Sequence, residues 1–276
     1  ALVAKQILAQ QGMTIPVVTT LHGTDITLVG REMTYEHVVS WSINQSDAVT
    51  AVSEDLRKQT YEHFKINRDI DVIPNFIDFG RFNKKPREHF KQMIAPNGEK
   101  IIIHTSNFRK VKRIEDVIAV FAQIIKEIPA KLLLIGDGPE RSHIEKVSRE
   151  FNTCDWVTFL GKQEAIEEIL SIGDLFILPS ESESFGLAAL EAMACEVPVI
   201  SSNAGGIPEV NIHGVTGYLS NVGDVNDMAQ NAITLLKDPQ LLAKFRKNAL
   251  QQAHKFDLAE ILLQYEAIYN RVITTN

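Results

Sequence analysis

Two glutamates separated by seven residues lie on either side of the start of an expected helix. Glu183 is in the loop after an apolar strand, and Glu191 is inside the helix that follows. The backbone N–H groups of Phe185, Gly186 and Leu187 begin that helix, where free donors and the helix dipole favour an anion. Carboxylates accept hydrogen bonds from sugar hydroxyls, so the segment predicts a site for phosphate joined to sugars. An acidic pair that only complements the helix dipole is the alternative.

The elements around this segment predict a parallel sheet. Short apolar, β-branched runs alternate with longer segments of helical period, which is typical of βα units. Ligands of such sheets bind at the carboxyl ends of the strands. Several unusual segments follow expected strands, and their convergence is a stronger signal than any one of them: 22–25, 106–113, 136–139, 180–191 and 203–209.

The series of expected strands and helices starts afresh near residue 76. The segment 74–96, which contains proline, glycine and several charges, is the best linker candidate. Residues 76–254 predict a complete doubly wound domain, whereas residues 1–75 provide only two or three strands, fewer than a full lobe needs. The helix expected in 255–276 has a wide apolar stripe, which predicts packing against the first lobe or an oligomer interface.

Composition narrows the possible partners. The formal net charge of −7 over 276 residues argues against nucleic acid, because phosphate binding needs a basic surface. Cys154 and Cys195 lack metal-ligand spacing and indicate reduced thiols, although a disulfide stays open. No signal peptide or membrane-spanning stretch is evident, so we expect a cytoplasmic protein without a membrane partner. The sequence begins in what resembles mid-helix at Ala1, so we expect an N-terminal segment to be missing.

The segment from Glu183 to Glu191 resembles the E-x7-E motif of the family-4 retaining glycosyltransferases of GT-B fold. Further similarity lies in 136–139 (GDGP), 160–161 (LG) and 205–210 (GGIPEV), and it extends from 22–25 to the final helix. The resemblance implies an α/β GT-B protein with two Rossmann-like, doubly wound lobes, the first incomplete in this chain. Residues 1–75 would be the C-terminal remnant of the acceptor-binding lobe. Residues 76–254 would bind the nucleotide sugar, and 255–276 would cross back to the first lobe.

The resemblance also implies roles for individual residues on the donor side. Glu183 would hold hydroxyls of the donor sugar, and Glu191 would hold the ribose hydroxyls of the nucleotide. Lys112 would contact the diphosphate, although a solvated surface charge is its ordinary explanation. Asn107 stands where the family commonly has an arginine, and Arg109, two residues on, is the candidate to supply that charge.

Two glycine turns and a histidine complete the expected donor site. Gly136 and Gly138 would allow a tight strand-to-helix turn beside the nucleotide, although such turns are individually weak evidence. His22 follows an expected strand and would face the donor sugar, as the resemblance implies; a purely structural histidine is the alternative.

The segments 19–27, 43–53, 74–78 and 106–113 are similar to one subgroup of this family. That subgroup transfers N-acetylglucosamine from UDP-N-acetylglucosamine to L-malate, the first step of bacillithiol biosynthesis. A dicarboxylate acceptor needs cations in its pocket, so Arg31 and the hydroxyl of Thr20 are the acceptor candidates. A surface salt bridge explains Arg31 equally well.

The resemblance implies no bound metal and no other cofactor, because Lys or Arg and a helix dipole neutralise the leaving diphosphate. The acidic pair in 69–71 imitates a metal motif but lies on a strand away from the site, so we interpret it as solvated charge. Two alternatives stay open: a transferase of this family with a lipid or polysaccharide acceptor, and a non-catalytic nucleotide-sugar-binding module. A homo-oligomer also stays open.

Overall fold

The computed structural model describes residues 1–23, 26 and 33–275, and the chain divides into two compact units. Unit 1 comprises Ala1–Phe76 and Phe256–Asn276, and unit 2 comprises Ile77–Lys255. Both units combine helices with a parallel sheet, so the predicted α/β class is confirmed. The predicted acceptor residue Arg31 lies outside the described residues.

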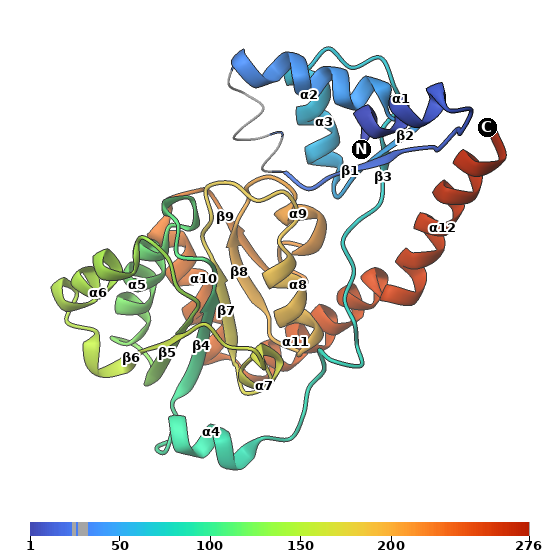
Figure 1. Ribbon diagram of the computed structural model, residues 1–276. Helices are drawn as coiled ribbons and strands as arrows, with labels where there is room; N and C mark the ends of the chain where they lie inside the picture. The colour runs from blue at the N-terminus through green and yellow to red at the C-terminus, as the bar shows by residue number, and fades with distance from the viewer. Residues whose placement is uncertain (24–25, 27–32, 276) are drawn as a thin grey trace. The chain divides into compact units, whose positions relative to one another are not determined.

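Unit 1 is built on a three-stranded parallel sheet of order β1-β2-β3 (Figure 1). The register pairs Val18 with Ala48 and Thr20 with Thr50. The Ser53 hydroxyl caps the helix after β2 by accepting a hydrogen bond from the Leu56 N–H at 3.1 Å, as its sequence position predicts. The elements are α1 (Leu2–Gln10), β1 (Val18–Leu21), α2 (Met33–Gln45), β2 (Ala48–Ala51), α3 (Glu54–His63), β3 (Asp71–Val72) and α12 (Leu258–Thr275).

The last helix, α12, belongs to unit 1 although it is remote in sequence. Its residues Ile261, Ile268 and Val272 are buried in a small core with Ala48 and Ile73 of the β-sheet region. The spacing of seven and four residues places these three side chains on one helix face. Much of the apolar stripe seen in the sequence therefore has an intramolecular partner.

An ion pair also joins α12 to β3. Arg271 pairs with Asp71, one of the two aspartates in the segment that imitates a metal motif. The pairing gives Asp71 a structural partner within unit 1. Among the residues that the structure describes, no group of three or more His, Cys, Asp or Glu side chains is arranged to hold a metal ion.

Unit 2 contains a six-stranded parallel sheet of order β6-β5-β4-β7-β8-β9 (Figure 1). The order reverses between β4 and β7, which is the switch point where open parallel sheets bind ligands. The strands are β4 (Lys100–Thr105), β5 (Ala130–Ile135), β6 (Val157–Gly161), β7 (Leu175–Leu178), β8 (Val199–Ser202) and β9 (Gly217–Ser220).

Helices cover both faces of this sheet. On one face α5 (Ile114–Ile124), α6 (Arg141–Glu150) and α10 (Val225–Lys237) pack together, and the large core beneath them includes Ile102, Leu132 and Phe121. The other helices of unit 2 are α4 (Glu88–Ile94), α7 (Ile166–Leu170), α8 (Leu187–Ala194), α9 (Ile207–Val210) and α11 (Pro239–Ala253).

The sequence analysis missed two elements of unit 2. The short strand β9 has only four residues and no apolar run, and its Gly217 is needed because a Cβ there would lie 1.8 Å from the Val199 carbonyl oxygen. The segment 74–96, which we expected to be a linker, contains α4. None of the seven residues of this helix is buried, so its sequence has no apolar pattern that would predict a helix.

Candidate active site

The carboxyl ends of β4 and β5 lie so close together that only glycine fits between them. A Cβ on Gly136, whose φ is +120°, would lie 1.8 Å from the Ser106 carbonyl oxygen, and one on Gly138 would lie 2.1 Å from that of Asn107. The Ser106 N–H donates to the Ile135 carbonyl oxygen at 3.1 Å, which holds the start of the first loop against the end of β5. The predicted glycine turn therefore brings 136–139 against 106–108.

Lys112 and Glu183 meet at the switch point. Lys112 ends a single 3₁₀ turn (η2, Lys110–Lys112), and its Nζ lies 2.5 Å from Oε1 of Glu183. The Ser180 hydroxyl donates to the same carboxylate oxygen at 3.1 Å. The two charged side chains are 20% and 15% exposed, so the pair is shielded from bulk water but still open to a ligand.

The backbone of Glu183 is fixed from the opposite side by the glycines after β8. The Gly206 N–H donates to the Glu183 carbonyl oxygen at 2.9 Å. A Cβ on Gly205, whose φ is +56°, would lie 1.9 Å from that oxygen. The pair of glycines, which the sequence analysis took as a turn, thus sets the position of the glutamate itself.

The start of α8 provides backbone donors rather than side chains. Gly186 adopts φ +95°, a left-handed conformation that favours glycine, and precedes the first residue of the helix. The Phe185 side chain is buried in the core at 2% exposure, so only its backbone is available to a ligand, whereas Leu187 is 42% exposed. A helix start of this kind favours an anion.

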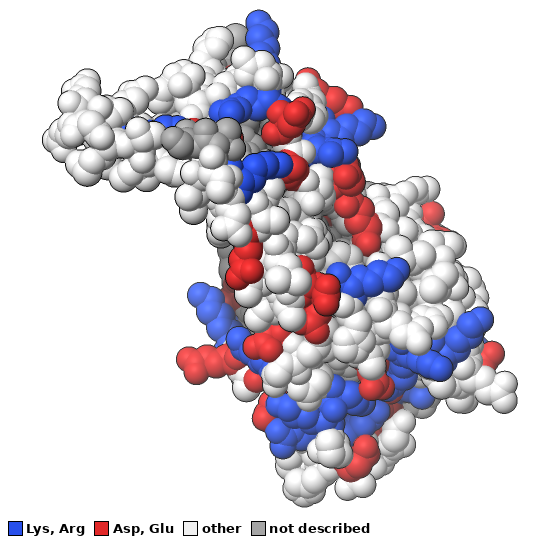
Figure 2. All heavy atoms as spheres, turned by 90° about the vertical axis from the view of Figure 1, so that its right-hand side faces the viewer, with Lys and Arg blue, Asp and Glu red and all other residues white. Residues whose placement is uncertain are grey.

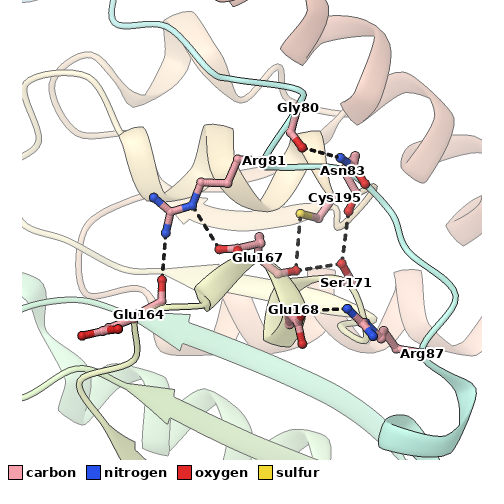
Figure 3. Close-up of polar contacts among 9 residues, drawn as sticks. All are labelled: Gly80, Arg81, Asn83, Arg87, Glu164, Glu167, Glu168, Ser171 and Cys195. Carbon is pink, nitrogen blue, oxygen red and sulfur yellow. Dashed lines mark hydrogen bonds and ion pairs between the residues drawn. The ribbon is translucent and has the colours of Figure 1, made fainter.

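Glu191 lies one turn further along α8 and is half-buried. Burial raises its pKa from 4.5 to about 7, a rise that Glu167 reinforces and Arg81 opposes. Figure 3 shows the Arg81 guanidinium between two groups at the start of α7. Its Nε lies 3.2 Å from Glu167 Oε2, and its Nη2 donates to the Glu164 carbonyl oxygen at 2.8 Å. Sequence reasoning did not find Arg81.

A buried histidine under the 106–113 loop was also missed. His104 lies at the end of β4, where its Nδ1 is 2.8 Å from the Ile177 carbonyl oxygen and its Nε2 is 2.9 Å from Ser106 Oγ. Burial lowers its pKa to about 4, so the ring is neutral near pH 7. A carbonyl only accepts, so Nδ1 carries the proton and Nε2 accepts from the serine hydroxyl.

The other polar side chains of the 106–113 loop have surroundings that differ from those of Lys112. Asn107 and Arg109 are exposed, and within the described residues Arg109 makes no side-chain ion pair or hydrogen bond. The Nε of Arg113 lies 2.7 Å from Asp116 Oδ2, so this guanidinium is paired with a carboxylate in the first turn of α5. Lys112 is therefore the cation of the loop that points at the glutamate.

Two of the predicted site residues, His22 and Thr20, belong to unit 1. His22 is exposed just after β1. Thr20 is half-buried, and its hydroxyl is 2.9 Å from that of Thr50 and also bonds Tyr265. These contacts give Thr20 a structural role. The expected parts of Thr20 and Arg31 in acceptor binding, and of His22 at the donor sugar, stay predictions.

The described chain has no helix that is long and apolar enough to cross a membrane. In unit 2 a lysine, a glutamate and a helix start gather at the switch point of the sheet, the place where doubly wound parallel sheets commonly bind nucleotides. Residues 85–252 match the family described as group 1 glycosyl transferases, and residues 2–81 match glycosyltransferase family 4. The chain belongs to the group 1 glycosyl transferases, with the GT-B fold.

Individual relatives agree with this family. The chain is 46% identical over 275 residues to the N-acetyl-alpha-D-glucosaminyl L-malate synthase of Bacillus anthracis, covering 99% of this chain and 71% of that protein. Sucrose-phosphate synthase from Thermosynechococcus elongatus superposes with a TM-score of 0.85 at 25% identity, covering 98% of this chain and 71% of that one. Anabaena HepE in complex with UDP and glucose gives 0.88 at 24% identity, covering 98% and 75%.

Proposed function

We propose that the protein transfers N-acetylglucosamine from UDP-N-acetylglucosamine to the hydroxyl of L-malate, with retention of the anomeric configuration. The observation that carries the proposal is the Lys112–Glu183 pair at the start of α8. Support for the particular substrates comes from the 46% identity to the Bacillus anthracis synthase over nearly the whole chain. The reaction is the first step of bacillithiol biosynthesis.

The pair suits a diphospho-sugar because its two members have complementary tasks. A diphosphate competes with Glu183 for the Lys112 ammonium group, since both are anions that take charge-assisted hydrogen bonds. The carboxylate is then available to accept hydrogen bonds from sugar hydroxyls. Ser180, which donates to the same carboxylate, keeps it oriented when the lysine turns away.

The reaction breaks the bond between the anomeric carbon and the β-phosphate oxygen and forms one between that carbon and the malate hydroxyl oxygen. The bonding electrons of the first bond leave with UDP, and the hydroxyl proton passes to the departing phosphate oxygen on the same face. Lys112 and the N–H groups at the α8 start stabilise the developing charge. We therefore propose that the reaction needs no metal ion or other cofactor.

The ribose end of the donor would lie at Glu191. A carboxylate accepts hydrogen bonds from both ribose hydroxyls only in its ionised form. Arg81, which opposes the raised pKa of Glu191, favours that form. We further propose that the protein acts in the cytoplasm on small-molecule substrates.

The test is product formation from UDP-N-acetylglucosamine with L-malate, followed by mass spectrometry and by UDP release. Succinate is the matched control, because it has both carboxylates but lacks the accepting hydroxyl. We expect a glycosylated product with malate and none with succinate, with the same rate in excess EDTA. UDP release that malate does not accelerate would overturn the acceptor assignment. UDP binding without any turnover would instead favour a nucleotide-sugar-binding module.

A further inference from the structure

A basic hollow lies in unit 2 beside α4. It has a volume of about 380 Å³. Its lining includes five cationic side chains and one acidic side chain, Glu88. In the space-filling view, Lys and Arg side chains gather over the lower end of the face shown (Figure 2), the height at which α4 lies in Figure 1. The five cations are Lys84, Lys85, Arg87, Lys91 and Arg246.

Two of these cations are held by one buried carboxylate. Asp174, which is 4% exposed, lies 3.1 Å from Lys91 Nζ and 2.7 Å from Arg246 Nη2. It also accepts the Ile101 N–H at 2.9 Å, so both of its oxygens are used. Asp174 therefore holds Lys91 and Arg246 in place beside the hollow.

Arg87 is only partly satisfied by its own partner. Its Nη2 lies 2.5 Å from Glu168 Oε1, the contact drawn in Figure 3. Its Nε is buried and has no hydrogen-bond partner among the described residues. An unpaired buried donor is costly, so an acceptor that enters the hollow is favoured there.

The two lysines at the rim leave a surplus of positive charge. Within the described residues, neither Lys84 nor Lys85 forms an ion pair or side-chain hydrogen bond. Desolvation lowers the pKa of Lys84, and the charges of Arg246 and Lys91 lower it further, while the carboxylates of Asp174 and Glu196 oppose the shift. Mutual repulsion of this kind is relieved by a bound anion.

The hollow also has a fixed polar wall. Ser171, at the end of α7, donates from its hydroxyl to the Asn83 carbonyl oxygen at 3.1 Å and to that of Glu167 at 2.7 Å (Figure 3). These contacts join the 83–87 segment to α7 and so hold the rim lysines next to Arg246. The site is assembled before any ligand arrives.

From this geometry we propose that unit 2 has a second anion site, formed by Lys84, Lys85, Arg87 and Arg246, that binds a phosphate group. The site is separate from the one at Lys112 and Glu183. Its ligand is inorganic phosphate or the phosphate of a small monoester, because a tetrahedral oxyanion offers several acceptors to converging donors.

The test is a phosphorus NMR titration of the whole chain with inorganic phosphate and, in a second arm, with phenyl phosphate. Saturating UDP occupies the donor site in both arms, and sodium chloride holds the ionic strength constant. The double variant Lys84→Gln/Lys85→Gln should weaken binding at least about tenfold, the effect of losing two charge-assisted contacts. The matched control is Lys126→Gln, an exposed lysine on another surface, which should leave binding unchanged.

The comparison of the two ligands identifies the source of the phosphate: tighter binding of phenyl phosphate indicates a monoester, and the reverse indicates the free ion. Equal binding by the wild type and the double variant, or no binding by the wild type, would overturn the proposal. Circular dichroism melting of each variant verifies that it is folded, and the phosphorus signals of UDP verify that UDP is bound.

Discussion

Lys112 and Glu183, which are 71 residues apart in sequence, form an ion pair, and we propose a separate task toward a nucleotide sugar for each of them. The lysine would meet the diphosphate, and the glutamate would meet the sugar. Both side chains are largely buried, and each charge compensates the other. We expect a bound nucleotide sugar to separate them. The first prediction follows from this contact.

Lys112→Gln should lower kcat by about 10² or more, because it removes a cation that stabilises the leaving diphosphate. Lys110→Gln is the matched control, since Lys110 is exposed on the same 3₁₀ turn. Steady-state kinetics with both variants measure the difference. Equal activity of the two variants would show that the diphosphate is held elsewhere.

Glu191→Gln should alter the pH dependence of UDP binding. In the wild type the affinity for UDP should fall as the pH drops below about 7, because the raised pKa leaves the carboxyl protonated there. The variant should bind more weakly at about pH 8 and show little change between about pH 6 and 8. Calorimetric titrations at several pH values measure this; parallel curves for both proteins would contradict the assignment.

The same substitution should stabilise the fold at alkaline pH. The folded-state pKa is about 7 and the unfolded value is 4.5, so unfolding releases a proton between these values and the wild type loses stability as pH rises through this window. Glu191→Gln should therefore gain up to about 3 kcal/mol in the free energy of unfolding between about pH 5 and 8, relative to the wild type. Urea denaturation at the two pH values measures the change, and a gain at pH 5 alone would have the wrong sign.

Ser106→Ala should weaken catalysis through the position of the loop that carries Lys112. It leaves His104 Nε2 without a donor, at a cost of about 1–3 kcal/mol. We expect kcat/KM to fall about tenfold, mainly through a higher KM for the nucleotide sugar, and Ser106→Thr to restore part of it. Ser142→Ala, an exposed serine on α6, is the control for loss of a hydroxyl. Loss of stability without a change in KM would leave Ser106 with a structural role only.

Gly205→Ala should be far more damaging than Gly161→Ala. Both glycines have positive φ, +56° and +66°, so both variants carry backbone strain of about 1 kcal/mol. A Cβ at Gly161 has no atom within 4 Å, whereas one at Gly205 would displace the Glu183 carbonyl. We expect Gly205→Ala to lose at least about 2 kcal/mol of stability and most activity. Comparable effects of the two substitutions, in denaturation and in kinetics, would contradict this.

The sequence predicted those features that depend on local pattern. The strand β4 (Lys100–Thr105) is an apolar, β-branched run of the kind that predicts a strand, and Ser53, a residue type favoured at helix N-caps, caps α3. The roles of Lys112 and Glu183 came from a resemblance, but their contact was not foreseen, because a pair so distant in sequence depends on the order of strands in the sheet.

Features without a local pattern were not predicted. His104 lies within an apolar strand and resembles an ordinary core residue; the serine two positions later, at the strand end, was the available signal. Arg81 lies in a segment of mixed charge, and nothing in its neighbours indicates that it reaches α7. Their roles arise from backbone carbonyls and carboxylates that only the folded chain brings close.

The assignment of α12 to unit 1 means that the polypeptide passes between the units twice, after Phe76 and after Lys255. In genetic terms, unit 2 is an uninterrupted insertion within the reading frame of unit 1. One proteolytic cut at either crossing leaves the other peptide connection intact, so release of unit 2 requires two cuts. Unit 2 can be encoded as one continuous gene segment, whereas unit 1 alone requires its two segments to be rejoined by a designed connection.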